Sequence, residues 1–282
     1  MTTSNVIKRV RRLGITALTA VALGVAGPGA ASAAQAEPVG KPSPAKPTVV
    51  LVHGAWADAS SFAPVTAGLQ REGYTVLAAP NPLRGLTSDA AYLAAFVKQR
   101  TSGPVILVGH SYGGAVITNA AAAIPNVKSL VYIDAHALAE GESVLDVTAA
   151  QPGSALGVPD PSTVFDFVQY PGAPAGDVDA YIKAEFFPAF FAAKLPKAVT
   201  ATLAVGQSPV TLSALSEKSA APAWASIPSF FFIGSEDKIL PPAEQEVMAK
   251  RAHGYVERGH TDHLAMLEAP TSIVKLITRA AK

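Results

Sequence analysis

The chain of 282 residues contains no cysteine, and charged residues make up only 15% of it. The absence of cysteine excludes disulfide bonds, so a buried core has to supply the stability of the fold. Hydrophobic residues account for 49% of the sequence, which is enough for one large core and argues against disorder.

Positive charge is scarce once the first 33 residues are set aside. Four of the 22 basic residues lie in that segment, which contains no acidic residue, so the remainder has 18 basic and 21 acidic residues and a net charge of −3. A mildly acidic body offers no basic surface for nucleic acid, and we expect no nucleic-acid partner.

The N-terminal segment has the three parts of a secretory signal peptide. Basic residues at positions 8 to 12 precede an apolar stretch of 14 residues, Leu13–Ala26, and the small residues Ala31-Ser32-Ala33 follow. A membrane anchor is the competing interpretation, but the apolar stretch is shorter than the ~20 residues that span a bilayer. We therefore predict a signal peptide over residues 1–33, export from the cell, and no stable membrane anchor after cleavage.

Beyond this segment, a linker leads into a series of short apolar runs. The proline-rich stretch EPVGKPSPAKP, Glu37–Pro47, predicts an extended linker over residues 34–47. Continuous apolar runs are typical of strands that are covered on both faces, as in a parallel sheet. Six runs fit this description: Thr48–Val52, Tyr74–Ala79, Val105–Val108, Leu130–Ile133, Phe230–Ile233 and, more weakly, Gly254–Glu257.

Amphipathic segments alternate with these strands and predict helices. In the first of them, Phe62, Val65 and Leu69 share one face, and Gly73 marks the end. The alternation predicts an α/β fold with a doubly wound, mostly parallel sheet of about six strands. The predicted helices are Ser61–Glu72, Ser88–Gln99, Tyr112–Ala123 and Thr271–Ala281.

The alternation stops between about His136 and Pro228, where prolines and aromatic residues become frequent, as in YIKAEFFPAFFAAKLP. Insertions of this length between core strands often carry function, and binding pockets are lined by apolar and aromatic side chains. We therefore predict a helical lid over residues 136–228 within one domain that covers residues 48–282. A helical decoration with no role in binding is the alternative.

The segment PVILVGHSYGGAV, Pro104–Val116, places Ser111 on a tight turn between an apolar strand and a helix. A G-x-S-x-G pattern in this setting is typical of a nucleophile elbow. Gly109 and Gly113 lack side chains, which lets strand and helix approach closely around a strained serine. A glycine-rich turn that only packs a helix against a strand is the alternative interpretation.

A reactive serine needs a base within hydrogen-bond reach and a third group that orients the base. In the order typical of this elbow, an acid and then a histidine follow the serine. Asp237 lies in the loop SEDKILPP after the apolar run FFFIG, at the end of a strand where doubly wound sheets collect functional residues. The later segment GHTDHLAMLEAP supplies His263 as the predicted base and His260 as the reserve.

A second tight turn, at His53-Gly54, follows the strand TVVLV. The amide of Ala55 is the first expected donor to an oxyanion, and the amide of Tyr112, directly after the serine, is the second. We expect His53 to shape the turn, because the histidine of a triad in this order comes last.

Other polar residues near the strand ends are weaker candidates. Asp134 follows the strand LVYI and is an alternative acid, whereas Glu236 lies one residue short of the expected spacing before the prolines. His260, Asp262 and His263 could suggest a metal site, but two histidines without a third ligand make a poor one.

Two more histidines follow apolar runs without a clear task. We expect His110, inside the elbow, to pack beneath it, and His136 to touch the rim of a pocket. No metal or other cofactor is predicted.

The segments HGAW, GHSYGG, GSEDKILPP and DHLAML resemble the α/β-hydrolase superfamily, and the resemblance covers Pro47 to the C-terminus. The chain is most similar to the compact branch that contains plant methyl-ester esterases and hydroxynitrile lyases, along with exported actinobacterial hydrolases. The phrase NPLRGLTSDAAYLAAF is similar to that bacterial group. The resemblance implies Ser111 as nucleophile, Asp237 as acid and His263 as base, with Ala55 and Tyr112 at the oxyanion positions.

Two departures from the superfamily pattern bear on the activity. Only about six strands fit, so the first two strands of the larger eight-stranded members are missing, as they are in the compact branch. The lyases of this branch carry a lysine directly after the histidine, where this chain has Leu264. The second departure favours ester hydrolysis over a lyase.

Together these features predict a secreted serine esterase that cleaves small to medium carboxylic esters through an acyl-enzyme intermediate. A small-molecule ester is the only partner implied, and the oligomeric state stays open. One alternative is a cofactor-free lyase or perhydrolase with the same triad. The other is a non-catalytic ligand-binding protein built on the hydrolase scaffold.

Overall fold

A computed structural model of the chain describes residues 45–150 and 152–282. The predicted signal peptide, residues 1–33, and most of the predicted linker, residues 34–44, lie outside the described part. Residues Pro44–Lys282 form one compact unit, which is the unit described below. None of the helices in the described ranges is long and apolar enough to cross a membrane.

Six parallel strands form the central sheet, as the sequence predicts. Their order across the sheet is β2-β1-β3-β4-β8-β9, and every neighbouring pair runs parallel. The run Thr48–Val52 matches β1 at both ends, and the other five strands each overlap one predicted run with ends that differ by up to three residues. The strands are β1 (Thr48–Val52), β2 (Val76–Ala79), β3 (Val105–His110), β4 (Val127–Ile133), β8 (Ser229–Gly234) and β9 (Tyr255–Gly259).

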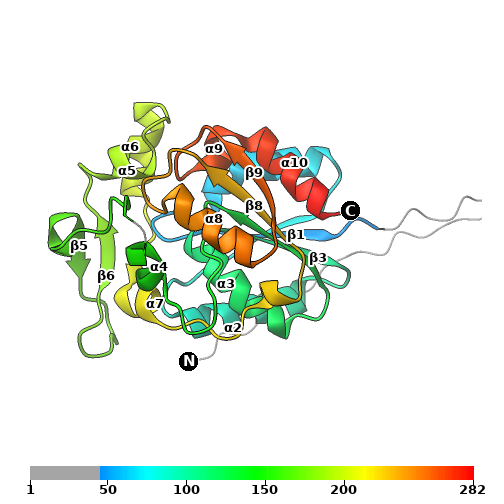
Figure 1. The fold of residues 1–282 in the computed structure, drawn as a ribbon, viewed down its shortest axis with the longest axis horizontal. Coiled ribbons are helices and arrows are strands. Elements are labelled where there is room, and N and C mark those ends of the chain that lie inside the picture. The colour runs from blue at the N-terminus through cyan, green and yellow to red at the C-terminus, as the bar shows by residue number, and fades with distance from the viewer. Residues whose placement is uncertain (1–44, 151) are drawn as a thin grey trace, which may run out of the picture. The chain divides into compact units, whose positions relative to one another are not determined.

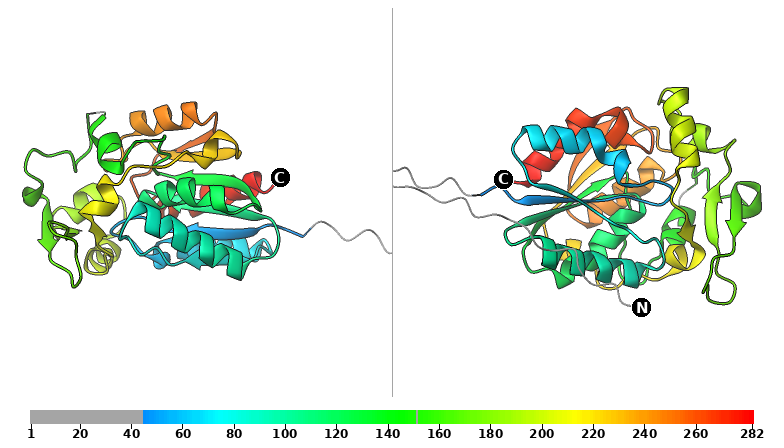
Figure 2. Two further views of the ribbon diagram at one scale, coloured as in Figure 1. Left: turned by 90° about the horizontal axis from the view of Figure 1, so that it is seen from below. Right: turned by 180° about the vertical axis from the view of Figure 1, so that it is seen from behind.

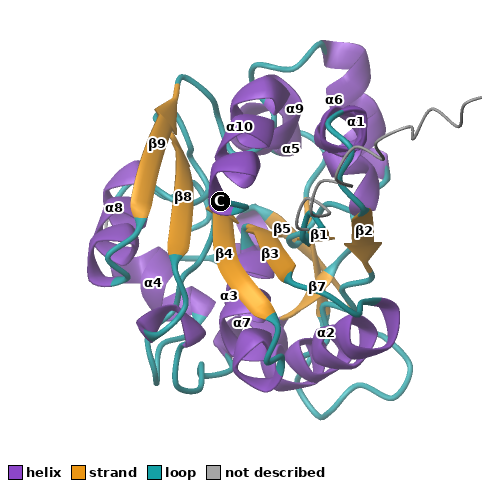
Figure 3. Cartoon of the chain, turned by 90° about the vertical axis from the view of Figure 1, so that its right-hand side faces the viewer, coloured by secondary structure: helices purple, strands orange, loops and turns teal. Residues whose placement is uncertain are grey.

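Helices cover both faces of this sheet (Figure 3). One face carries α1 (Ala63–Arg71) and α10 (Pro270–Ala280), and the other carries α2 (Leu86–Arg100), α3 (Tyr112–Ala120) and α8 (Pro242–Arg251). The sequence predicted four of these five helices and missed α8. Its sequence, PAEQEVMAKR, holds few apolar residues, so the helical period is weak, although a proline in the first turn is a signal for a helix start.

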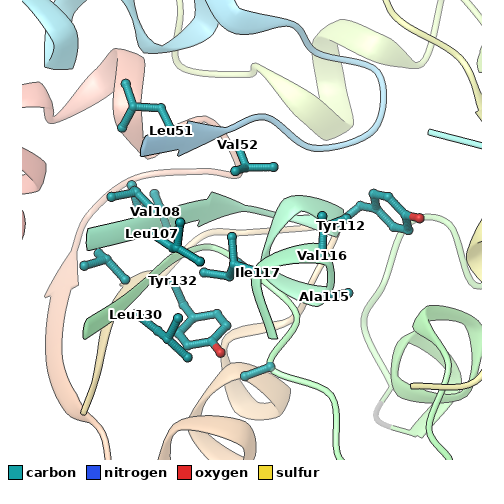
Figure 4. Packing of buried hydrophobic residues seen from close by; sticks show 14 of the residues in the cluster. Leu51, Val52, Leu107, Val108, Tyr112, Ala115, Val116, Ile117, Leu130 and Tyr132 are labelled. Atoms are coloured by element: carbon teal, nitrogen blue, oxygen red, sulfur yellow. The ribbon is translucent and has the colours of Figure 1, made fainter. Parts of the chain in front are cut away.

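Burial on both faces explains the continuous apolar runs of the central strands. Every residue of β3 is buried, and so are Val49 to Val52 of β1. Side chains of β1, β3 and β4 pack against Val116 and Ile117 of α3 (Figure 4). This packing holds the carboxyl ends of the strands, where the predicted site residues lie, in a fixed arrangement.

The insertion between β4 and β8 is only partly helical, so the prediction of a helical lid was incomplete. It contains α4 (Val144–Ala150), α5 (Phe187–Phe191), α6 (Lys197–Val205) and α7 (Leu212–Ser216). It also contains a small antiparallel sheet in the order β5-β6-β7, from Phe165–Val168, Asp179–Ile182 and Val210–Thr211.

The three strands of the insertion escaped prediction because they are short and lie among prolines and glycines. Their pairing is non-local: Val210 of β7 lies opposite Ala180 of β6, across two intervening helices. Figures 1 and 2 show β5 and β6 beyond one end of the main sheet, on the side of the insertion helices α5 and α6.

Candidate active site

Ser111 lies on the turn between β3 and α3 with a strained backbone. Its φ of 51° and ψ of −124° lie outside the regions that residues with a side chain favour. Glycines make the turn possible, because a Cβ at Gly109 would come within 2.5 Å of the Gly113 carbonyl oxygen, and one at Gly113 would overlap the carbonyl oxygen of Val52. The turn therefore holds Ser111 at the carboxyl edge of the sheet, as a nucleophile elbow does.

The structure brings Ser111, His263 and Asp237 together from three separate parts of the chain. The Oγ atom of Ser111 lies 3.0 Å from Nε2 of His263, and Nδ1 of His263 lies 2.8 Å from Oδ2 of Asp237. These residues follow β3, β9 and β8, and all three are buried, with His263 fully enclosed. The three side chains form a continuous line of hydrogen bonds.

The partners of Asp237 fix the direction of these hydrogen bonds. Its Oδ1 accepts from the amides of Ile239 and Leu240, at 2.8 and 3.0 Å. Its Oδ2 accepts from Nε2 of Gln245 at 2.9 Å, and the same nitrogen donates to the Leu240 carbonyl. Asp237 is thus an acceptor only, so Nδ1 of His263 carries the ring proton and Nε2 accepts from the Ser111 hydroxyl.

Asp134, the alternative acid, is not the hydrogen-bond partner of His263, whose Nδ1 is paired with Asp237. It directly follows β4, which pairs with β8, and its Oδ1 accepts from the amide of Gly234 at 2.6 Å. Burial and the nearby charge of Asp237 raise the pKa of Asp134 well above its ordinary value. The hydrogen bond to Gly234 places Asp134 at the start of the loop that carries Asp237.

His260, the reserve base, points away from Ser111. Its side chain is 82% exposed and pairs with Glu236 at 2.7 Å. Glu236 also accepts from Nζ of Lys194, at 2.9 Å, so both residues belong to a surface ion-pair group. His260 and His263 are thus engaged by different partners, and the metal-site alternative for this segment loses its second ligand.

The turn after β1 lies directly beside the serine. A Cβ at Gly54 would come within 2.6 Å of the Ser111 Cβ atom, so glycine is required there. His53 shapes this turn, since its Nδ1 lies 3.0 Å from the Gly54 carbonyl oxygen and its own carbonyl accepts from Asn81. The adjacent Ala55 lines the same cavity as Ser111 and Tyr112.

A cavity of about 290 Å³ opens in front of Ser111. Its lining is almost entirely apolar, and no acidic residue, lysine or arginine takes part. Most of the lining belongs to the insertion, including Val144, Leu145, Phe165, Phe167 and Leu215. The insertion thus forms most of the wall around the serine.

Three further residues hold His263 and Asp237 in place, and of these the sequence had pointed only to His110, which is buried beneath the elbow as expected. The Nε2 atom of His110 donates to the His263 carbonyl at 2.9 Å, and burial keeps the pKa of His110 well below its ordinary value. Phe191 of the insertion packs edge-on against the His263 ring, with centroids 5.0 Å apart. Gln245, which supports Asp237, lies on the helix that was not predicted. Only the strand-end position of His110 gave a signal in the sequence.

The insertion is also tied to the loop that carries His263. The amide of Lys194 donates to Oδ2 of Asp262 at 3.1 Å, and its Nζ donates to the His260 carbonyl at 2.8 Å. Glu268 accepts from the amide of Asp262 at 3.2 Å. Burial and the Asp262 carboxylate raise the pKa of Glu268 to about 8. The contacts of Lys194 thus connect the insertion to the loop that carries His263.

Comparison with known proteins finds relatives that are named esterases, at low sequence identity. A carbendazim hydrolyzing esterase of Nocardioides sp. strain SG-4G is 36% identical over 108 residues, which cover 34% of this chain and 45% of the esterase. The putative chloroplastic methylesterase 13 of Arabidopsis thaliana is 28% identical over 262 residues, 83% of this chain and 56% of that protein. The match thus spans about half the length of each of these two relatives.

Solved structures share the fold at low sequence identity, which supports a similarity of fold alone. Polyneuridine aldehyde esterase superposes with a TM-score of 0.70 at 19% identity, over 84% of this chain and 100% of the other. An extracellular alpha/beta-hydrolase from a Paenibacillus species gives a TM-score of 0.67 at 22% identity, over 84% and 99% of the two chains.

The family model of the alpha/beta hydrolases matches residues 49–276, which include the six strands of the main sheet, except for the first residue of β1, and the whole insertion. With this match, the sheet order and the serine turn after β3, the chain belongs to the alpha/beta hydrolase family.

Proposed function

We propose that this protein is a serine esterase that hydrolyses small to medium carboxylic esters through an acyl-enzyme intermediate. The observation that carries the proposal is the line of hydrogen bonds from Ser111 through His263 to Asp237, on a strained turn that faces an apolar cavity. The names of the relatives, which are esterases and methylesterases, agree with this chemistry.

In the first half of the reaction, Oγ of Ser111 attacks the ester carbonyl carbon while Nε2 of His263 takes the hydroxyl proton. The negative charge passes to the carbonyl oxygen, which the amides of Ala55 and Tyr112 would bind. Each such donor is worth about 3 kcal/mol in the transition state. His263 then returns the proton to the departing alkoxide, and an alcohol leaves.

In the second half, His263 takes a proton from water, which attacks the acyl carbonyl. The bond from the acyl carbon to Oγ of Ser111 then breaks, His263 returns the proton to Oγ, and the acid leaves. Asp237 holds the Nδ1–H tautomer throughout and stabilises the imidazolium that forms in both halves. Its two backbone amide donors and Gln245 keep the carboxylate aimed at the ring.

The insertion supports the assignment of substrate size. A cavity of about 290 Å³ is large enough for a small to medium ester, and its wall is mainly apolar. We propose that the insertion acts as a lid whose helices and small sheet set the shape of this cavity.

Replacement of the nucleophile tests the proposal. We expect Ser111→Ala to abolish hydrolysis of 4-nitrophenyl acetate and butyrate while circular dichroism and the unfolding midpoint stay near those of the wild type. A fluorophosphonate probe should label the wild type at Ser111 and fail to label the variant. Undiminished turnover in Ser111→Ala would remove this serine from the mechanism, and an unlabelled, inactive wild type would favour a ligand-binding protein.

We further propose that the protein is exported, on the basis of the basic, apolar and A-x-A segments of residues 1–33. Expression in a secreting host, followed by mass spectrometry of the culture supernatant, tests this. The expected mature chain begins at Ala34, and retention of the full chain inside the cell would contradict the proposal.

A further inference from the structure

The segment NPLRGLTSDAAYLAAF, Asn81–Phe96, contains a buried carboxyl group that the reaction described above does not use. This group belongs to Asp89 of α2, which is 1% exposed. Its Oδ2 accepts from the amides of Arg84 and Gly85, at 3.1 and 3.5 Å, and from the Tyr112 hydroxyl at 2.8 Å. Two of the donors come from the start of α2 itself, whereas the third comes from the residue directly after the proposed nucleophile.

The segment that leads into α2 is fixed by the small sheet of the insertion. The Leu83 carbonyl accepts from the amide of Thr211 at 3.1 Å, and the Arg84 carbonyl accepts from the hydroxyl of the same threonine at 3.2 Å. The guanidinium of Arg84 also pairs with Asp179 of β6. The backbone that donates to Asp89 is therefore held from two sides, which gives the carboxyl group a defined position.

The backbone of Tyr112 supplies the second proposed donor to the oxyanion. Tyr112 is the first residue of α3, so its N–H has no acceptor within the helix. The Ser111 carbonyl, which belongs to the same planar peptide, accepts from the amides of Gly114 and His136, at 2.9 and 3.2 Å. These two hydrogen bonds orient the peptide plane on the serine side, and the Tyr112 N–H points in the opposite direction. On the other side of the peptide, the side chain of Tyr112 is the remaining restraint.

We propose that Asp89 is a positioning residue, which acts through the Tyr112 hydroxyl to hold the Tyr112 amide where the oxyanion forms. The inference rests on the proposed esterase function. The Tyr112 side chain is buried at the cavity, and its hydrogen bond to Asp89 fixes the far end of the ring. Loss of this bond leaves a buried polar group unpaired, and relief of that cost shifts the ring and the first turn of α3. A small shift of a reacting group is enough to slow the reaction.

Two tyrosine variants form a matched test. We expect Tyr112→Phe to lower kcat for 4-nitrophenyl butyrate by about tenfold and to keep KM within about twofold, because an oxyanion donor acts in the transition state. Tyr132→Phe is the control, since this tyrosine is also fully buried and its hydroxyl lies 2.9 Å from that of Thr118. The two tyrosines lie on different elements, α3 and β4 (Figure 4), and Tyr132→Phe should keep the wild-type kcat. An unchanged kcat in Tyr112→Phe, or equal losses in both variants, would overturn the inference and leave the esterase function intact.

Variants of Asp89 assign the effect to the hydrogen bond. Asp89→Leu removes the acceptor and should lower kcat as much as Tyr112→Phe does. The double variant should lose no more than either single variant, because both changes break the same bond. Asp89→Asn, which keeps an oxygen for the Tyr112 hydroxyl, should restore most of the kcat that Asp89→Leu loses. Losses that multiply in the double variant would contradict an action through Tyr112. Circular dichroism checks the fold, and if Asp89→Leu is unfolded, the comparison of the tyrosine variants decides.

A trifluoromethyl ketone separates failure of this inference from failure of the proposed function, because it requires no turnover. Oγ of Ser111 adds to the ketone carbon, the hydroxyl proton passes to Nε2 of His263, and the carbonyl oxygen becomes an oxyanion. In fluorine NMR titrations with benzyl trifluoromethyl ketone, we expect the adduct of Tyr112→Phe to be about tenfold weaker than those of the wild type and Tyr132→Phe. If the wild type hydrolyses no ester but forms a tighter adduct than Tyr112→Phe, the esterase function fails and the positioning stands. Equal adduct affinities in the wild type and Tyr112→Phe, or no adduct, would overturn the positioning.

Discussion

The ring of His263 hydrogen-bonds Asp237 and not Asp134, although the two aspartates follow the neighbouring strands β8 and β4. Asp237 is surrounded by donors: two amides, the Gln245 side chain and the His263 ring. Asp134 has the Gly234 amide and a raised pKa. The Asp237 carboxylate is thus aimed at the ring by its donors, whereas burial and the neighbouring Asp237 disfavour ionisation of Asp134.

Replacing each aspartate by asparagine should therefore give different results. Asp237→Asn removes the acceptor that fixes the His263 tautomer, and kcat should fall by about 10⁴. Asp134→Asn keeps an uncharged oxygen for the Gly234 amide and should retain most of the wild-type kcat. The measurement is the initial rate with 4-nitrophenyl butyrate at saturation. A larger loss in Asp134→Asn than in Asp237→Asn would reverse the assignment.

The close packing at the serine turn predicts that Gly113→Ala destabilises the fold. An added Cβ would overlap the carbonyl oxygens of Val52 and His53, which belong to rigid backbone and cannot move aside. We expect a loss of about 3 kcal/mol or more in the free energy of unfolding, measured in urea. Gly103→Ala is the control, because nothing lies within 4 Å of the added atom. Equal stabilities of the two variants would contradict the packing.

Gly54→Ala should affect the reaction more than its substrate affinity. The added Cβ would lie 2.6 Å from the Ser111 Cβ and 2.8 Å from the His110 carbonyl oxygen, which forces the turn and the Ala55 amide outward. Misplacement of a donor by about 1 Å can cost about 10²-fold in rate. Steady-state kinetics should show a reduced kcat with a similar KM. An unchanged kcat in a folded variant would remove the Ala55 amide from the mechanism.

Glu268 should make the fold less stable as the pH rises. Its pKa is raised from 4.5 to about 8 by burial and by Asp262, so within this range the folded chain holds a proton that the unfolded chain releases. Stability is therefore present at low pH and is lost as the pH rises towards 8. Glu268→Gln should flatten the profile of unfolding free energy between pH 5 and 8 in urea titrations. Parallel profiles of unfolding free energy against pH in the wild type and in Glu268→Gln would contradict the binding of this extra proton by the folded chain.

The main sheet could be predicted from the sequence because each of its strands is a local signal. A run such as VILVGH is apolar along its whole length, and its burial on both faces requires that composition. The strands FDFV and DAYI of the insertion are short, and their pairing depends on contacts far along the chain. No local pattern distinguishes them from loops.

The residues of the site could also be predicted only in part. Ser111, Asp237 and His263 could be named because each follows an apolar run in a recognisable order. The contacts that distinguish His263 from His260, and Asp237 from Asp134, are made by side chains from other elements, such as Gln245. The place of His136 in the cavity wall is likewise visible only in three dimensions, since its sequence signal is just a position after a strand.

The insertion leaves and rejoins the sheet between β4 and β8, two strands that are hydrogen-bonded neighbours. A change in the length or sequence of the insertion therefore leaves the strand order and the register of the main sheet unchanged. Replacement of the insertion, in evolution or by engineering, can therefore change the wall of the cavity while Ser111, Asp237 and His263 keep their positions at the main sheet. A replacement insertion would have to preserve one set of contacts, which Phe191 and Lys194 make with His263 and its loop.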